Sequence, residues 1–238
     1  MKEQYLIKFS KKDSIKFIGH LDLMRTIQRM IKRSALPVEY SKGFNPHINM
    51  SIAQPLAVGI YSCGEYMDVY FESETSEEEI IEKLNKSAPL GIKISRANKV
   101  YNVENKKIFK SMAAIRAAKY SIQIPYIDTS EIEEHMKDLM NMSVWTTLKR
   151  TKKGEKETDI KKLVKCIHYF ICDNKLVLDT TICCGSLDNL SPKLLSNYIQ
   201  NTIEGSDKNS FINIMRKEMY GEIRNKLIPL YEYVDKIH

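Results

Sequence analysis

The chain has 238 residues, of which 43% are hydrophobic and 28% are charged, and its formal net charge is +7. This composition is typical of a folded globular protein and excludes a disordered chain. The length allows one large domain or two of about 100–120 residues each. No apolar run approaches the roughly 18 residues of a membrane span, and the start of the chain lacks a signal-peptide core. We therefore expect a cytoplasmic protein with no membrane partner.

The first half of the chain predicts one α+β domain. Strands are expected where β-branched and aromatic residues alternate, at 4–9, 48–52, 65–71 and 92–100. Helices are expected where apolar residues recur at helical spacing, at 21–36 and about 75–88. The order strand, helix, strand, strand, helix, strand predicts a ferredoxin-like (βαββαβ) domain, which we assign to residues 1–103.

The polar segment 102–110 is expected to be a linker, and a second ferredoxin-like domain to occupy residues 111–238. Its strands are predicted at 117–125, 145–151, 165–172 and 175–183. Helices are predicted at 130–142 and from Pro192 onward. Further on, Phe211, Ile214, Met215 and Met219 recur at helical spacing and predict an added C-terminal helix.

Basic residues are concentrated in two segments, one in each half. Between Lys11 and Arg33 seven basic side chains face two acidic ones, and between Lys149 and Lys165 eight face three. The second segment includes Lys152 and Lys153 in a predicted turn. Such clusters indicate an anionic partner, with nucleic acid the first candidate, although a plain solvated surface has the same composition.

The start of the first predicted helix has features of an anion-binding site. Gly19 and His20 lie where free backbone amides attract phosphate. Arg25 and Arg29 lie one turn apart and can extend that surface, while Asp22 can orient His20 or pair with Arg25. The plainer interpretations are that His20 packs at the helix start and that the arginines form the solvated helix face.

The loop after this helix is the second half of the predicted site. It contains glycine, asparagine and proline, which favour turns, together with aromatic and basic side chains. The predicted ligand-binding residues here are Tyr40, Lys42, Phe44, Asn45 and His47. Aromatic rings can stack on bases, each stack being worth roughly 1–3 kcal/mol. Alternatively, Phe44 only packs the loop onto the core.

The five cysteines have no CxxC spacing. We therefore expect neither a disulfide framework nor a metal or iron–sulfur site, and no cofactor.

The residues Phe17–Arg25, Leu36-Pro37, Tyr40–His47, Pro55-Leu56, Gly59 and Ser62–Tyr66 closely resemble one bacterial family, the radical SAM-associated (radical SAM-linked) proteins, whose function is not established. The resemblance implies a stand-alone form of a domain that accompanies a radical SAM enzyme, with an RNA-linked role. The chain lacks the CxxxCxxC cysteines that such enzymes use to hold their cluster, so the resemblance implies the accessory component and not the redox catalyst.

We therefore expect a non-redox accessory protein of a radical SAM enzyme that binds RNA or a ribosomal component. One alternative is a metal-independent RNA-cleaving or RNA-modifying enzyme that uses His20 or His47, because a histidine next to arginines favours a neutral imidazole that can act as a base. Tandem ferredoxin-like domains are also similar to those of CRISPR repeat-processing endoribonucleases, a similarity that rests on fold analogy alone. Another alternative is a protein–protein adaptor that binds no nucleic acid.

Overall fold

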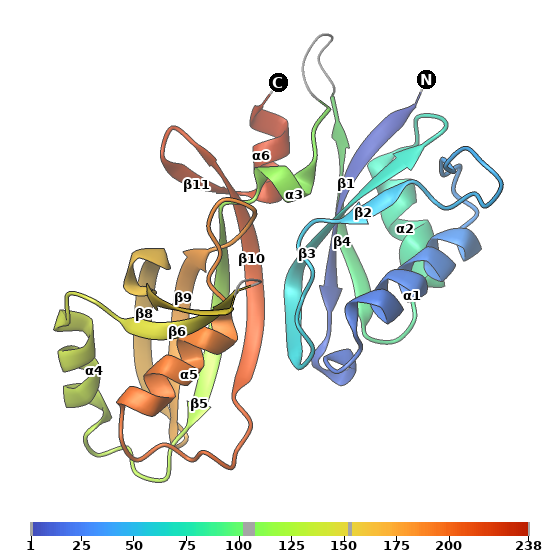
Figure 1. Cartoon of the computed structure of the whole chain (residues 1–238). Coiled ribbons are helices and arrows are strands. Elements are labelled where there is room, and N and C mark those ends of the chain that lie inside the picture. Colours follow the sequence, from blue (N-terminus) through green and yellow to red (C-terminus); the bar gives the residue numbers. More distant parts are fainter. Residues whose placement is uncertain (1, 102–107, 152–153, 238) are drawn as a thin grey trace. The chain divides into compact units, whose positions relative to one another are not determined.

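The computed structural model describes residues 2–101, 108–151 and 154–237 (Figure 1). The fold contains both helices and strands, which confirms the α+β class. Two compact units divide the chain, one formed by Met1–Arg116 with Arg216–His238 and the other by Ala117–Met215. The predicted second domain included residues 216–238, whereas the structure places them in the first unit. That each half is a ferredoxin-like domain stays a prediction.

The N-terminal part of the first unit follows the predicted element order. Its elements are β1 (Glu3–Lys11), α1 (His20–Arg33), β2 (Met50–Ile52), β3 (Ile60–Phe71), α2 (Glu77–Ser87) and β4 (Ile92–Val100). A 3-10 turn, η1 (Asp13–Ile15), joins β1 to α1. In the sheet β1 lies between β4 and β3, β2 lies beyond β3, and these pairs are antiparallel.

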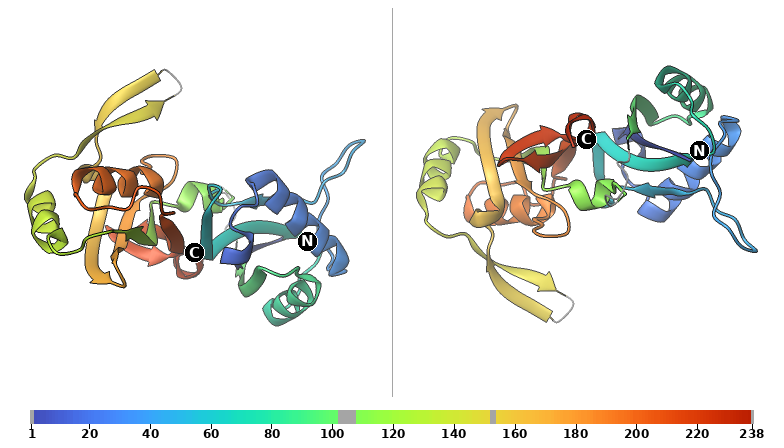
Figure 2. Two further views of the ribbon diagram at one scale, coloured as in Figure 1. Left: turned by 90° about the horizontal axis from the view of Figure 1, so that it is seen from below. Right: turned by 90° about the horizontal axis from the view of Figure 1, so that it is seen from above.

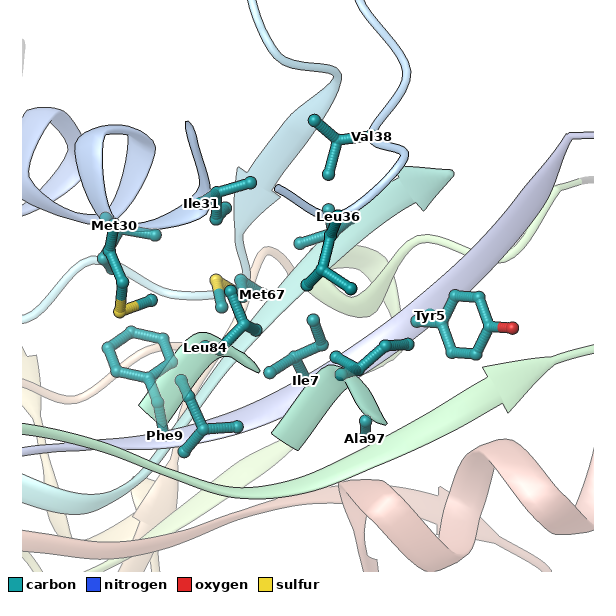
Figure 3. Close-up of a cluster of buried hydrophobic side chains, with 14 of the residues drawn as sticks. Tyr5, Ile7, Phe9, Met30, Ile31, Leu36, Val38, Met67, Leu84 and Ala97 are labelled. Atoms are coloured by element: carbon teal, nitrogen blue, oxygen red, sulfur yellow. The ribbon is translucent and has the colours of Figure 1, made fainter. Parts of the chain in front are cut away.

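The main core of this unit lies between the sheet and its two long helices. Alternate residues of β1, including Ile7 and Phe9, point to the same face as Met67 of β3. The helices cover this face with apolar stripes that include Met30 of α1 and Leu84 of α2. Figure 3 shows these side chains gathered in one cluster. The core therefore fixes where the exposed face of α1 lies.

The C-terminal part of the first unit consists of β10 (Asn213–Ile223), which starts in the second unit, β11 (Lys226–Pro229) and α6 (Leu230–Lys236). A short helix, α3 (Ser111–Ala114), precedes the second unit. The helix predicted from Phe211 to Met219 is wrong, because the chain from Asn213 onward is part of strand β10, which pairs with β3. Met219 and Ile214 are buried as strand residues. Gly64 permits the close approach, since a Cβ there would lie 2.4 Å from the carbonyl oxygen of Lys217.

A buried ion pair joins β10 to β3. The guanidinium of Arg216 donates from Nε to Glu65 Oε1 at 2.7 Å and from Nη2 to Glu65 Oε2. It also donates to the backbone oxygen of Gln54 at 2.7 Å. Both side chains are almost fully buried, with 2% and 1% of their surfaces exposed. Burial of two charges at this depth is tolerated because each is hydrogen-bonded and faces an opposite charge.

The second unit has its own sheet and helices. The strands β5 (Ala117–Pro125), β9 (Lys175–Cys183) and β8 (Val164–Cys172) pair antiparallel in that order. The helices are α4 (Ile132–Asn141) and α5 (Pro192–Thr202), and a short 3-10 turn, η2 (Lys161–Leu163), precedes β8. A separate hairpin of β6 (Thr146–Thr151) and β7 (Gly154–Asp159) extends from this unit (Figure 2).

The ion pair gives a direct test of this packing. Glu65→Gln keeps the shape of the side chain but removes the negative charge that faces the buried Arg216 guanidinium. We expect the free energy of unfolding to fall by about 3–5 kcal/mol, measured as a lower denaturant midpoint. The matched control is Glu79→Gln, which breaks the exposed Glu79–Lys83 pair of α2 and should change stability by no more than about 1 kcal/mol. Equal effects of the two changes would contradict the buried pair.

Candidate functional site

The loop Ser41–His47, which we call the tip loop, extends from a narrow backbone stem. Tyr40 and Ile48 form an isolated β-bridge at its base. Inside the stem, the backbone N–H of Ser41 donates to the carbonyl oxygen of His47 at 2.7 Å, and the N–H of His47 donates to Ser41 Oγ at 3.0 Å. Figure 2 shows the loop projecting from the first unit. The stem therefore positions the tip loop although the loop itself has no core.

The residues of the tip loop face solvent. Lys42, Asn45 and His47 are exposed. Gly43 has a φ of +123°, a conformation that glycine adopts easily. The ring of Phe44 is fully exposed, at 112% of its reference area. The alternative that Phe44 packs the loop onto the core is therefore wrong, and its ring is free to stack on or insert into a partner.

A polar depression of about 350 Å³ lies beside the root of this loop. Its lining consists of Lys2, Gln4, Glu39, Asn49, Tyr70 and Ile108. The Lys2 ammonium and the Asn49 amide both donate to Glu39, and the hydrogen bond from Lys2 is the main cause that lowers the pKa of Glu39. These internal partners satisfy the Glu39 carboxylate, so we interpret the depression as structural support for the loop.

His20 is the first residue of α1, and Gly19 is its N-cap without a side-chain cap. The Nδ1 atom of His20 is buried and has no hydrogen-bond partner among the described residues. Asp22 does not orient it; instead Asp22 Oδ1 accepts from Arg25 Nη1 at 3.3 Å on the helix surface. Of the two partners predicted for Asp22, His20 and Arg25, the structure therefore shows Arg25.

The exposed face of α1 carries a row of cationic side chains, which we call the basic row: Arg25, Arg29, Lys32 and Arg33. Arg33 donates to the carbonyl oxygen of Ser87 at the end of α2, at 3.1 Å. Arg29 and Lys32 have no ion-pair or hydrogen-bond partner within the described part of the chain. Their charges are therefore available to an external anion.

The predicted site residues form two surfaces. No hydrogen bond, ion pair or ring contact among the described residues joins His20, Asp22, Arg25 or Arg29 to the tip loop. In Figure 1 the tip loop lies beyond the C-terminal end of α1, whereas His20 begins the helix. The predicted residues therefore lie in two groups, one along α1 and one in the tip loop.

The other two predicted residues, Lys152 and Lys153, lie outside the described residues. The hairpin that leads to them is described, with Lys149 opposite Lys156 and Thr151 opposite Gly154.

One cation of the first basic segment, Lys11–Arg33, does not lie on the surface. Lys11 is buried, and its ammonium donates to the carbonyl oxygens of Lys16 and Ile18 at 3.0 and 2.9 Å. Burial lowers the pKa of Lys11, while the negative charge of Glu65 opposes that effect. The buried partner Glu65 could have been singled out, because it lies in the Ser62–Tyr66 part of the family resemblance, whereas no pattern in the sequence marks Arg216.

A small apolar patch lies around the start of α1. Phe17, Leu21 and Val58 expose 65%, 68% and 47% of their surfaces. The backbone N–H of Gly59 donates to the carbonyl oxygen of Lys16 at 2.9 Å, which ties the two contributing loops together. This apolar patch was not predicted, because exposure of an apolar side chain is not visible in the sequence.

A model of a protein family, described as an uncharacterized protein conserved in bacteria (DUF2344), matches residues 4–192. No curated protein matches the chain.

Solved structures show similarity in the fold. A chain of a Cbf5–Nop10–Gar1 complex is 9% identical with a TM-score of 0.50, and the similarity covers 97% of the present chain and 54% of that chain. The present chain thus spans about half the length of this neighbour. An unknown protein from Galdieria sulphuraria is 11% identical with a TM-score of 0.27, covering 91% of this chain and 99% of that one. At these identities only the first similarity supports the fold, and neither assigns a function.

Exposure of the tip loop predicts that Phe44 does not contribute to stability. Phe44→Ala should leave the free energy of unfolding within about 0.5 kcal/mol of the unmodified protein. The matched control Phe9→Ala removes a fully buried ring and should cost about 3–5 kcal/mol. Denaturant unfolding measures both. A loss for Phe44→Ala comparable to that for Phe9→Ala would mean that the loop packs on the protein.

Proposed function

This chain belongs to the DUF2344 family of uncharacterized proteins conserved in bacteria, and we propose that it is a cytoplasmic accessory protein that binds RNA and presents it to a radical SAM enzyme. The enzyme partner is supported by the sequence resemblance of Phe17–Arg25 and Tyr40–His47. The RNA ligand is supported by the basic row and the tip loop. No helix in the described ranges has both the length and the apolar character that a membrane crossing requires.

The basic row is the observation that carries the RNA proposal. Four cations lie on one face of a single helix, and two of them, Arg29 and Lys32, have no internal anion to neutralise them within the described ranges. Phosphates of an RNA backbone satisfy such side chains and release condensed counterions when they bind. Arginine also forms bidentate bonds with phosphate oxygens, which lysine does not. The row thus fits a polyanion better than a single small anion.

The tip loop can contact the bases of an RNA, which contacts to its phosphate backbone alone do not reach. A fully exposed ring at Phe44, beside the cation Lys42, can stack on an unpaired base while the lysine contacts the adjacent phosphate. This combination favours single-stranded or looped RNA over a regular duplex, in which the bases are already stacked.

The apolar patch supports the accessory part of the proposal. Phe17, Leu21 and Val58 offer clustered side chains of the kind that are buried when two proteins associate. They lie at the start of α1, whereas Arg29, Lys32 and Arg33 lie in its second half. One helix can therefore contact a protein with one end and RNA with the other.

The enzyme alternative has less support. Neither His20 nor His47 forms a side-chain hydrogen bond to an acid or base among the described residues, so no such group orients either imidazole for catalysis.

RNA binding predicts a steep dependence of affinity on salt. The combined change Arg29→Ala and Lys32→Ala should lower the slope of log affinity against log salt by about 1–2 and weaken binding of unrelated sequences alike. Fluorescence anisotropy with a single-stranded RNA across a salt series measures this slope. Lys137→Ala, at an exposed position of α4, is the matched control and should leave the slope unchanged. Absence of binding by the unmodified protein at low salt removes the RNA proposal.

Docking through the apolar patch predicts that Leu21→Asp abolishes association with the radical SAM protein after nuclease treatment, because a carboxylate in a buried contact loses its hydration. Size-exclusion chromatography of the two purified proteins measures the complex. Leu90→Asp is the matched control, since Leu90 is exposed to 89% on another loop of the same unit. Retention of the complex by Leu21→Asp places the contact elsewhere.

A further inference from the structure

The sheet of the second unit has one buried and one open face. Along β5 and β9 buried and partly exposed residues alternate, with Ile122, Leu178 and Ile182 on the buried face. Along β8 the more exposed residues are Cys166, His168, Phe170 and Cys172. Side chains two apart on a strand point to the same face, so the exposed cysteines and the histidine share the open face.

Two of these side chains form a dyad. The Sγ atom of Cys166 lies 3.2 Å from Nε2 of His168, the distance at which a thiol donates a proton to an imidazole nitrogen. Both residues are exposed. An adjacent imidazole that takes the thiol proton is the usual means of generating a reactive thiolate.

Charged groups on neighbouring strands complete the surroundings of the dyad. Asp179 of β9 lies directly opposite His168 in the register and forms an ion pair with Lys119 of β5 at 3.1 Å. Residues opposite each other in an antiparallel pair have neighbouring side chains on one face. The open face beside the dyad therefore carries an anionic and a cationic group.

Cys166 also borders a depression of about 170 Å³ at the edge of the sheet. Trp145, Lys161 and Lys165 line the same depression. The ammonium of Lys161 is held above the Trp145 ring and donates to the carbonyl oxygens of Met140 and Met142. An open depression of this size admits a small reagent but not a folded protein domain.

We propose that Cys166 and His168 form a reactive-thiol site that undergoes thiol–disulfide exchange with low-molecular-weight disulfides. His168 takes the proton from the Cys166 thiol, and the thiolate attacks one sulfur of the small disulfide. The disulfide bond of the reagent breaks while a new one forms to Cys166. The released half leaves as a thiolate and receives the proton from His168. Cys166 is oxidised, the released half is reduced, and the product is a mixed disulfide on the open face.

Cys172 is an internal comparison for this site. It is exposed on the same strand and the same face, but its neighbour is Asp173, whose hydrogen bond and negative charge raise the pKa of the Cys172 thiol. Oxidised glutathione, added to the full chain, reports both cysteines in one experiment when the peptides are resolved by mass spectrometry. Cys166→Ser identifies the adduct at Cys166.

The rate of adduct formation at Cys166 should exceed that at Cys172, and His168→Gln should reduce it. Loss of the adjacent base should lower the rate at Cys166 several-fold, while the rate at Cys172 in the same protein stays unchanged. An unchanged denaturant midpoint shows that this exposed substitution has not altered the fold. Equal rates at the two cysteines, or a rate at Cys166 unaffected by His168→Gln, overturn the proposal.

Discussion

The buried contact between Arg216 and Glu65 is the constraint on which the first unit depends. It binds a strand near the C-terminus to a strand formed about 150 residues earlier, and it does so inside the protein, where neither charge reaches water. A charged pair in such a position tolerates little displacement, because each lost hydrogen bond leaves a buried charge uncompensated. The pair therefore fixes β10 against β3 in one register, with Gly64 providing the space.

This arrangement also positions the surfaces to which we assign binding. Arg216 donates to the backbone of Gln54, and Lys11, in the electrostatic field of the same pair, holds the carbonyl oxygens that precede α1. The start of α1 and the segment that carries Val58 are thereby held from the interior. The apolar patch and the basic row can be exposed without losing their geometry, since the groups that order them are buried beneath them.

The two proposals concern different parts of the chain and different chemistry. The basic row, the tip loop and the apolar patch belong to the first unit and recognise their partners without changing a covalent bond. The Cys166–His168 dyad belongs to the second unit and changes the covalent state of a surface thiol. Neither depends on how the two units are placed relative to each other.

Much of the local structure could be predicted from the sequence. The alternation in β1 and β3, the apolar stripes of α1 and α2, and the strands β8 and β9 are local patterns, and local patterns report which face of an element is buried. The exposed arginines of α1 followed from the same periodicity. The segment Phe211–Met219 was misassigned because its apolar spacing is compatible with a helix and with a strand; pairing with β3 decided the outcome, and that pairing is not local.

The sequence by itself determined the α+β class, the amphipathic first helix, the exposed turn-rich loop and membership of an uncharacterized bacterial family. Only the tertiary structure decided that Lys11 is buried, that Glu65 meets Arg216, and that the predicted residues form two surfaces in place of one pocket. Only the register of β8 and β9 placed His168 opposite Asp179 beside Cys166. The physical reason is the same in each case: burial and side-chain contact depend on partners distant in the sequence, which no local pattern specifies.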